Sequence, residues 1–527
     1  MNKKYQTTYH NNSTGQLILP VNTGVLIAEN DPVFTFNEVL EGVNLNKYLK
    51  TSYYGRPGYN SMTLLKIILF SFMINVKTTR KIADLCAHDI RLMWLGNNIK
   101  PSHNVIAHFI KHILTQNIDD ILVELNHYFI TANNIETDML YLDGTKIEAN
   151  ANKYTFVWKK AVLKYQTRLY EKISAVIAGL LPVLSQYNIE TNIEIKNKYS
   201  ALDIGAIAEL LAQVIAKQGI QLVYGKGKHK LNIQKYYDLF RKYYEKAVEY
   251  EEKLEICGEY RNSYAKTDHD ATFMRMKEDH MRNGQLKASY NIQIGVSAEY
   301  IMNVSVSQDR TDYQTFPVFL NDYRHKYDFM PAYVVADAGY GGYDNYLFCK
   351  ENKIKLFQKY VMYTKEKEKS FRKKEFNSRN FNYHDNGVIT CNEGKKFVYE
   401  LSSINERGNY PKIIDYYQCY DCHECPKQRL CTKAKDGYRK LQVCAKQRAL
   451  EKEAKQNLDS QLGIELRVQR SIQVEGAFGV IKQDLNYRRL YRKGLENVKT
   501  EVTLVCIGYN LMKYHHKKLR ALYPIQA

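Results

Sequence analysis

Three short segments, each with one carboxylate, constrain the fold of this chain more than any other feature. Leu-Asp-Gly-Thr-Lys around Asp143 and Val-Ala-Asp-Ala-Gly around Asp337 each end a short apolar run that is typical of a buried strand. Gln-Val-Glu-Gly-Ala-Phe around Glu475 lies in a helical pattern with an apolar stripe. An acid just past a buried strand is held at the carboxyl edge of a sheet, where open α/β sheets build their sites. We therefore expect the three acids to converge and to hold two Mg2+ ions about 4 Å apart, an arrangement that serves phosphoryl displacement.

The charge balance favours a polyanionic partner. Lys and Arg number 76 against 56 Asp and Glu, which gives a net charge of +20 in a chain of 527 residues. Such an excess favours a polyanionic partner such as a nucleic acid, although a solvated basic surface is the alternative. The longest apolar run, Leu64 to Val76, falls short of the roughly 18 residues that a membrane span needs. With no apolar signal region at the N-terminus, we expect a cytoplasmic protein without membrane contact and with mostly reduced cysteines.

The first 130 residues predict a helical unit. Residues 1–50 form a largely polar N-terminal segment with weak apolar alternation, and residues 51–130 favour short helices joined by brief turns. Thr78 or Thr79 is expected to cap one helix and Ser102 another, because a hydroxyl there accepts an otherwise unpaired backbone N–H.

The helix after Ser102, expected to end near Ile113, has a polar face that includes His103 and Asn104. Short helices of this kind are typical of helix-turn-helix packing, in which one helix reads DNA. We predict that His103 and Asn104 contact DNA, and a plain helical bundle is the alternative.

The rest of the chain alternates strand and helix patterns, which favours a mixed α/β fold. Inserts aside, the order of elements from 135 to 515 is that of an RNase H-like core carrying the three acids. The N-terminal helical domain precedes this core, and residues 516–527 form a tail. The expected elements are strand 139–147, a helical insert at about 157–260, a hairpin of 288–296 and 300–306, a helix from about 313, strand 332–336, helix 343–352, strand 354–360, a cysteine-bearing insert at about 361–450 and the helix around Glu475.

The cysteine-bearing insert has a cluster that favours zinc. Cys419, Cys422, Cys425 and Cys431 are separated by two, two and five residues, and Cys391 lies upstream. Thiols this close in a reducing compartment favour tetrahedral Zn2+ over disulfides. The preferred ligands are Cys422, Cys425 and Cys431, with Cys391 or Cys419 as the fourth. Reduced cysteines in a basic insert are the alternative.

Four ordered blocks of the sequence resemble bacterial insertion-sequence transposases of the DDE class, and in particular the IS eleven-eighty-two group. The likeness covers about residues 30 to 515. The blocks are the helical region that begins at Gly55-Arg-Pro-Gly-Tyr, Asp143-Gly-Thr-Lys-Ile-Glu-Ala-Asn, Asp268-His-Asp-Ala-Thr-Phe-Met through Asn283-Gly-Gln-Leu-Lys, and Ala336-Asp-Ala-Gly-Tyr followed by Arg470-Ser-Ile-Gln-Val-Glu-Gly-Ala-Phe.

The resemblance implies that Asp143, Asp337 and Glu475 are catalytic ligands of Mg2+, with Mn2+ as a substitute. It also implies DNA recombination with double-stranded DNA as the partner: cleavage at the terminal inverted repeats of a transposable element, then strand transfer into target DNA. The protein would act at the nucleoid, as a homodimer when two ends are synapsed. Two rivals stay open, a non-catalytic DNA-binding protein derived from a transposase and an RNase H-like nuclease without strand transfer.

In related insertion-sequence groups an Arg stands four residues before the Glu and a Lys seven after it. Lys482 fits the second place, but Ser471 occupies the first. Arg470 comes one residue before that place, about 100° around an α-helix from it, so we do not expect Arg470 to contact phosphate. The expected phosphate contacts are Lys482, Arg488, Arg489, Arg492 and Lys493.

Overall fold

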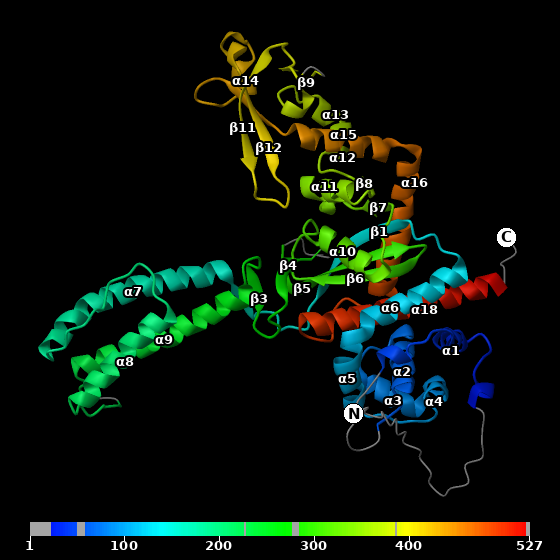
Figure 1. Ribbon diagram of the computed structural model, residues 1–527, viewed down its shortest axis with the longest axis horizontal. Coiled ribbons are helices and arrows are strands. Elements are labelled where there is room, and N and C mark those ends of the chain that lie inside the picture. The colour runs from blue at the N-terminus through cyan, green and yellow to red at the C-terminus, as the bar shows by residue number, and fades with distance from the viewer. Residues whose placement is uncertain (1–22, 50–57, 226–227, 277–283, 385–386, 523–527) are drawn as a thin grey trace, which may run out of the picture. The chain divides into compact units, whose positions relative to one another are not determined.

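The computed structural model describes residues 23–49, 58–225, 228–276, 284–384 and 387–522 (Figure 1). Parts of two blocks discussed above, Gly55–Pro57 and Asn283, lie outside the described residues. Contacts divide the chain into two units. The second unit consists of Lys146–Tyr290 and Lys493–Leu495, and the first takes the rest. No helix in the part of the chain that the structure describes is both long enough and apolar enough to cross a membrane.

A mixed sheet is the centre of the first unit. Strands β1 (Met139–Glu148), β7 (Tyr333–Ala336) and β8 (Lys355–Gln358) run parallel, in the order β1-β7-β8. On the other side of β1 lies β5 (Leu286–Ser297), which pairs antiparallel with β6 (Tyr300–Ser307). The sequence predicted these five strands and the hairpin to within about two residues at most ends.

Helices follow the strands as the sequence predicts. The helix α10 (Thr315–Tyr327) comes after β6, and the helix α11 (Tyr343–Glu351) comes after β7. Both bury aromatic side chains, such as Phe316 and Tyr346, beside the sheet. The connections leave the carboxyl ends of β1 and β7 at the same edge.

The N-terminal part of the first unit is helical. Thr78 and Ser102 accept backbone N–H groups from Lys81 and Val105, which confirms both expected caps. Where residues 33–36 alternate, the chain is helical instead, because Asp31 caps a helix that has Pro32 at its first position. The elements are η1 (Thr23–Leu26), α1 (Pro32–Gly42), η2 (Asn46–Tyr48), α2 (Ser61–Met73), α3 (Thr79–His88), α4 (Ile90–Leu95), α5 (His103–Phe109), a π-helical turn η3 (Ile110–Leu114) and α6 (Thr115–Asn133).

The long C-terminal helix α18 (Leu495–Leu522) completes the core of these helices. It is buried around most of its circumference, as expected of a helix that is surrounded by protein. Thr35 bonds to its His515 over 2.9 Å, and Asn126 of α6 accepts from Asn510 over 3.0 Å. The expected C-terminal tail is therefore wrong as far as Leu522, because residues 516–522 continue this helix.

Close packing of α18 on α2 gives a first prediction. A Cβ on Gly508 would stand 2.8–2.9 Å from backbone atoms of Phe72 and Met73, where a side chain does not fit. We expect Gly508→Ala to destabilise the protein by about 1–3 kcal/mol, although alanine favours helices. The control is Gly479→Ala, because a Cβ there meets nothing within 4 Å. Urea unfolding measures both, and equal midpoints would contradict the packing.

The second unit contains the expected helical insert. Helices α7 (Lys159–Gln186), α8 (Ala201–Lys217) and α9 (Asn232–Cys257) lie side by side around a core of Ile, Leu and aromatic side chains (Figure 1). A short antiparallel pair, β2 (Phe156–Trp158) and β3 (Ser263–Ala265), closes its base. Sequence patterns missed β2, which is only three residues long. Within this unit β4 (Thr272–Arg275) pairs with the beginning of β5.

The cysteine-bearing insert belongs to the first unit and forms its own antiparallel sheet, in the order β13-β12-β11-β10-β9. Helix α15 then leads to α16 and the segment that carries Glu475. The elements are η4 (Ala338–Tyr340), α12 (Tyr363–Lys367), α13 (Lys369–Arg372), η5 (Ser378–Asn380), β9 (Asn382–Tyr383), β10 (Ile389–Thr390), β11 (Lys396–Asn405), β12 (Lys412–Cys419), η6 (Tyr420–Glu424), α14 (Gln428–Cys431), β13 (Arg439–Val443), α15 (Ala445–Asp459), α16 (Gln461–Arg470), η7 (Ser471–Glu475), α17 (Gly476–Gly479) and η8 (Val480–Asp484).

Candidate active site

Two of the three predicted acids lie on neighbouring strand segments: Asp143 lies within β1, which continues to Glu148, and Asp337 directly follows β7. In the parallel pairing of β1 and β7, Leu142 faces Ala336, so Asp143 and Asp337 are the next residues on adjacent strands. Adjacent strands lie roughly 4.8 Å apart, which places both acids at one edge. Asp143 accepts the backbone N–H of Gly144 over 2.8 Å, and this bond fixes its carboxyl group.

Glu475 is linked to Asp143 by the side chain of Arg470. One guanidinium nitrogen of Arg470 donates to Glu475 over 3.1 Å, and another lies 3.6 Å from Asp143. The Arg470 side chain is 18% exposed and that of Asp143 13%, so their ion pair is poorly screened by water. Glu475 is 54% exposed. A single guanidinium thus joins an acid on β1 to an acid more than three hundred residues later.

A π-helical turn makes this contact, whereas the expectation for Arg470 assumed α-helical geometry. Residues Ser471–Glu475 form a π-helical turn rather than an α-helix. In such a turn the backbone hydrogen bonds run between residues five apart, so residues at that spacing lie on one face. Arg470 and Glu475 are five apart. The early position of the arginine is therefore compensated by the local winding of the helix.

A fourth acid, Asp312, lies beside the other carboxylates, and sequence patterns missed it. Its carboxylate accepts from Asn291 over 2.7 Å and from Gln293 over 2.9 Å. A Cβ on Gly144 or on Gly339 would stand 2.9 or 3.3 Å from oxygens of Asp312, so this acid packs against the residue after Asp143 on β1 and against the turn that follows β7. The available signal was an acid between the hairpin and the following helix, where strand ends gather.

The pKa of Tyr340 reflects the negative charge of the carboxylates around it. Burial raises the pKa of its phenol well above the usual value, and the carboxylates of Asp312, Asp143 and Asp337 raise it further. Its hydroxyl donates to Gln293, so it stays a neutral hydrogen-bond donor at the floor of the site. Several acids thus act on one buried ring, as expected where they surround one volume.

The donor set of this site suits Mg2+, because carboxylate oxygens are the hard ligands that Mg2+ prefers. Among the described residues, however, no three His, Cys, Asp or Glu side chains are spaced to hold a metal ion together. Between Asp143 and Glu475 the positive charge is that of Arg470. The metal site of Asp143, Asp337 and Glu475 stays a prediction, and the arginine must move for these acids to share an ion.

Two family models match parts of the chain. Residues 390–515 match a transposase DDE domain, and residues 22–112 match a transposase domain called DUF772. These matches support an insertion-sequence transposase. A DDE domain implies an enzyme that cleaves or transfers DNA, generally with a divalent metal ion such as Mg2+. No curated protein and no solved structure matches the chain. Glu475 lies in the first match, whereas Asp143 and Asp337 lie outside both.

Transposases bind DNA, and the predicted phosphate contacts after Glu475 differ in exposure. Arg488 and Arg489 are exposed, and Lys482 is half-buried in the second π-helical turn. Arg492 is also half-buried, and burial lowers the pKa of its guanidinium. The expectation that Arg492 contacts DNA is weakened, because its surface is largely covered by protein. Lys493 is exposed but belongs to the second unit.

The loop that carries Arg488 and Arg489 is held by a buried acid. Glu501 of α18 is 1% exposed and accepts the Tyr487 hydroxyl over 2.8 Å. It also accepts the backbone N–H groups of Tyr491 and Arg492, and burial raises its pKa. The loop is therefore fixed against the helical part of the unit.

In the N-terminal helices, Asn104 is exposed and His103 is half-buried at the start of α5. The helix does not end at Ile113 as expected, because a π-helical turn joins α5 to α6. Asn104, His108 and His112 form a polar face along α5 and the π-helical turn that follows it. The rings of His108 and His112 are 4.4 Å apart. Contact of this face with DNA stays a prediction.

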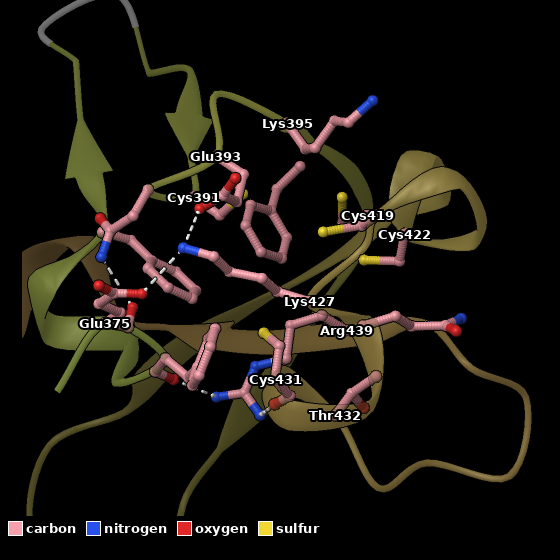
Figure 2. Close-up of a pocket in the computed structure, with 16 residues that line it drawn as sticks. Glu375, Cys391, Glu393, Lys395, Cys419, Cys422, Lys427, Cys431, Thr432 and Arg439 are labelled. Carbon is pink, nitrogen blue, oxygen red and sulfur yellow. Dashed lines mark hydrogen bonds and ion pairs between the residues drawn. The ribbon is translucent and has the colours of Figure 1, made fainter.

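The structure brings the predicted cysteines together. Cys391, Cys419, Cys422, Cys425 and Cys431 line one small cavity in the cysteine-bearing insert (Figure 2). His423, a neighbouring side chain that could also bind a metal, is exposed and packs its ring edge-on against Tyr438, and it does not line the cavity.

Proposed function

We propose that this protein is a DNA transposase that cleaves the ends of an insertion element and transfers them into target DNA. The observation that carries the proposal is the joining of Asp143 and Glu475 by Arg470, beside Asp337 on the adjacent strand. The three acids come from segments that are distant in the sequence, within a chain of which two parts match transposase family models. Assignment to the IS eleven-eighty-two group rests on the sequence blocks alone.

The strand order supports an RNase H-like core. An antiparallel hairpin flanks β1, and two further parallel strands follow on its other side, in the order β6-β5-β1-β7-β8. The helical insert follows β1 and the cysteine-bearing insert follows β8. The first acid lies within β1, one residue beyond the pairing of β1 with β7, the second directly follows β7, and the third lies on the closing helical segment.

Asp143, Asp337 and Glu475 would hold Mg2+, or Mn2+ in its place. The bound ions would neutralise the negative charge of the reacting phosphate and activate the attacking oxygen. The overall reaction is hydrolysis of one phosphodiester, which leaves a 3′ hydroxyl at the element end. That hydroxyl then attacks a target phosphodiester, so one P–O bond forms as another breaks.

Arg470 has two roles in this proposal. Before DNA binds, its guanidinium neutralises Asp143 and Glu475, which would otherwise repel each other. When DNA enters, the same guanidinium turns to a phosphate oxygen, since planar guanidinium groups match phosphate geometry. Lys482, seven residues after Glu475, supplies a second cation.

One assay tests the reaction and separates the rivals. A labelled duplex from the DNA that borders the coding gene is incubated with the full-length protein, a target plasmid and Mg2+. We expect cleavage of the duplex and its joining to the plasmid. Binding without cleavage would support a non-catalytic DNA-binding protein, and cleavage without joining would support a nuclease.

Backbone contacts to DNA give a second prediction. We expect the double variant Arg488→Gln with Arg489→Gln to lower the slope of log affinity against log salt concentration by about 2, because each neutralised phosphate contributes about 0.9. The matched control removes two exposed charges on α15, Lys452→Gln with Lys455→Gln. Binding is measured on the same duplex at several KCl concentrations. Equal slopes in both double variants would contradict this contact.

Synapsis of two element ends calls for at least two copies of the chain on DNA. We expect the polar face of α5, with His103 and Asn104, to bind the terminal inverted repeats. The expected place of action is the nucleoid of a bacterial cell.

A further inference from the structure

Five thiols surround a cavity whose size fits one ion. Cys391, Cys419, Cys422, Cys425 and Cys431 line a cavity of about 30 Å³ in the cysteine-bearing insert (Figure 2). A water molecule needs roughly 10–15 Å³ of such volume, so a single ion fits and a larger ligand does not. The lining thiols come from separate segments, and Figure 2 shows the labelled ones facing the same space.

The backbone presents four of these thiols on turns or helix ends. Cys422 and Cys425 enclose a tight turn in which the N–H of Cys425 bonds to the carbonyl of Cys422 over 3.1 Å. A second turn begins at Cys391, which accepts the N–H of Gly394 over 2.9 Å. Cys431 ends the short helix α14. Paired turns of this kind are how structural zinc sites present their ligands.

Cys419 is placed differently. It ends β12, where its backbone pairs with Arg439 of β13, and it is 1% exposed. A strand residue inside a ladder cannot shift without breaking hydrogen bonds, whereas turn residues adjust more easily. The thiol of Cys431 interacts electrostatically with those of Cys391, Cys422 and Cys425, and the thiol of Cys419 interacts with those of Cys422 and Cys391, so only its place on the strand sets Cys419 apart.

Cations at the cavity suit a negatively charged metal–thiolate centre. Lys427 lines the cavity and forms ion pairs with Glu393 over 2.7 Å and with Glu375 over 3.1 Å. Arg439 also lines it and donates to the carbonyls of Cys431 and Phe376. Its third nitrogen, Nε, is buried and has no hydrogen-bond partner among the described residues. Such a donor is expected beside metal-bound sulfur, because second-shell groups hydrogen-bond to the ligands.

We propose that Cys391, Cys422, Cys425 and Cys431 bind one structural Zn2+ ion, and that Arg439 donates to one of its thiolates. The four sulfurs do not yet stand at the spacing of a metal shell in the described part of the chain. In tetrahedral zinc the sulfurs lie at about 2.3 Å from the metal, so binding draws the turns together. Cys419 remains a buried thiol outside the shell.

A bound metal ion would stabilise the cysteine-bearing insert. The hydrophobic cluster around the cavity is small: its buried members are Phe381, Ile389, Phe397, Leu441 and Val443 together with Cys419 and Cys422. A core of this size rarely stabilises a module by itself, and metal binding then supplies folding free energy. The ion would thus fix the insert from which α15 and α16 lead to Glu475. This inference is independent of transposition.

The test measures metal in the full-length protein. We expect about one zinc per chain by elemental mass spectrometry after purification in reducing buffer without chelator. Cys391→Ser, Cys422→Ser, Cys425→Ser and Cys431→Ser should each lose the zinc. Cys419→Ser should keep it, as should the control Cys444→Ser. Cys444 caps α15 outside the cavity, where serine also caps well.

A second measurement needs no variant and therefore survives poor folding of the cysteine variants. In the wild-type protein, iodoacetamide should leave the four ligand thiols unmodified until a chelator is added, and peptide mass spectrometry identifies them. Replacement by Co2+ should give thiolate-to-cobalt absorption of a tetrahedral site. Absence of zinc together with absence of this absorption overturns the proposal. Loss of zinc in Cys419→Ser but not in Cys391→Ser overturns the ligand assignment.

Discussion

Asp143→Asn is expected to lose both cleavage and strand transfer, by about 10³-fold or more, while DNA binding changes little. The loss follows because the amide has no charge to hold a divalent cation or to pair with Arg470, and 10³-fold corresponds to about 4 kcal/mol of barrier. Folding should be preserved, since an amide oxygen still accepts the N–H of Gly144. Gel assays of the labelled duplex measure cleavage and joining, and filter binding measures affinity.

The matched control for this variant is Glu148→Gln. Glu148 lies on the same strand, and its ion pair with Lys287 over 2.8 Å is partly exposed, so its loss costs little. We expect activity within about threefold of the wild type. If the Asp143→Asn protein is active, the carboxylate at this sheet edge is not required for catalysis. Lost DNA binding in a folded Asp143→Asn protein would mean that the aspartate serves binding instead.

Arg470→Met is expected to bind Mn2+ more tightly and yet to cleave DNA more slowly. In the wild type an entering ion has to displace the guanidinium from Asp143 and Glu475. If that displacement costs about 1 kcal/mol, its removal tightens Mn2+ binding about fivefold, which calorimetry can measure. Cleavage should fall about 10²-fold, because a cation that stabilises the reacting phosphate is lost. Opposite changes in affinity and rate distinguish this arginine from a purely structural residue.

Arg467→Met is the control for Arg470→Met. Arg467 lies almost one turn earlier, and its guanidinium donates to the carbonyls of Gly463 and Leu458 rather than to an acid. We expect Arg467→Met to keep the Mn2+ affinity of the wild type. Its melting temperature should fall, and the fall should be the same with and without Mn2+. Unchanged Mn2+ affinity in Arg470→Met would show that the guanidinium does not guard the site.

Most strands and the positions of two acids were predictable, because they depend on local pattern. Short buried runs identify the strands that lead to Asp143 and Asp337, although β1 does not end at Asp143 and continues to Glu148. The caps Thr78 and Ser102 were predictable for the same reason. The close spacing of four cysteines in the sequence also predicted a cluster of thiols in one insert.

What sequence patterns missed depends on winding and on distant contacts. Arg470 was misplaced because a 3.6-residue period was assumed where the helix is π-wound. Asp312 was missed because its partners Asn291 and Gln293 lie on a strand that carries no acid of its own. The sequence left Cys391 and Cys419 as alternatives for the fourth ligand, and both line the cavity, so the choice between them depends on their backbone surroundings and not on spacing.

The joining of the chain's last helix to its first helices has a consequence for synthesis in the cell. Helix α6 ends at Asn133 and α18 begins at Leu495, roughly 360 residues later. At about 5–20 residues per second the ribosome needs roughly 20–70 seconds to supply that partner. Until then the surface that will receive Gly508 and Asn510 is open to water and to chaperones. A shortened product that stops before α18 would therefore keep the region matched by DUF772 but lack the helix that packs on it. We expect proteases to degrade such a product faster than the full-length protein.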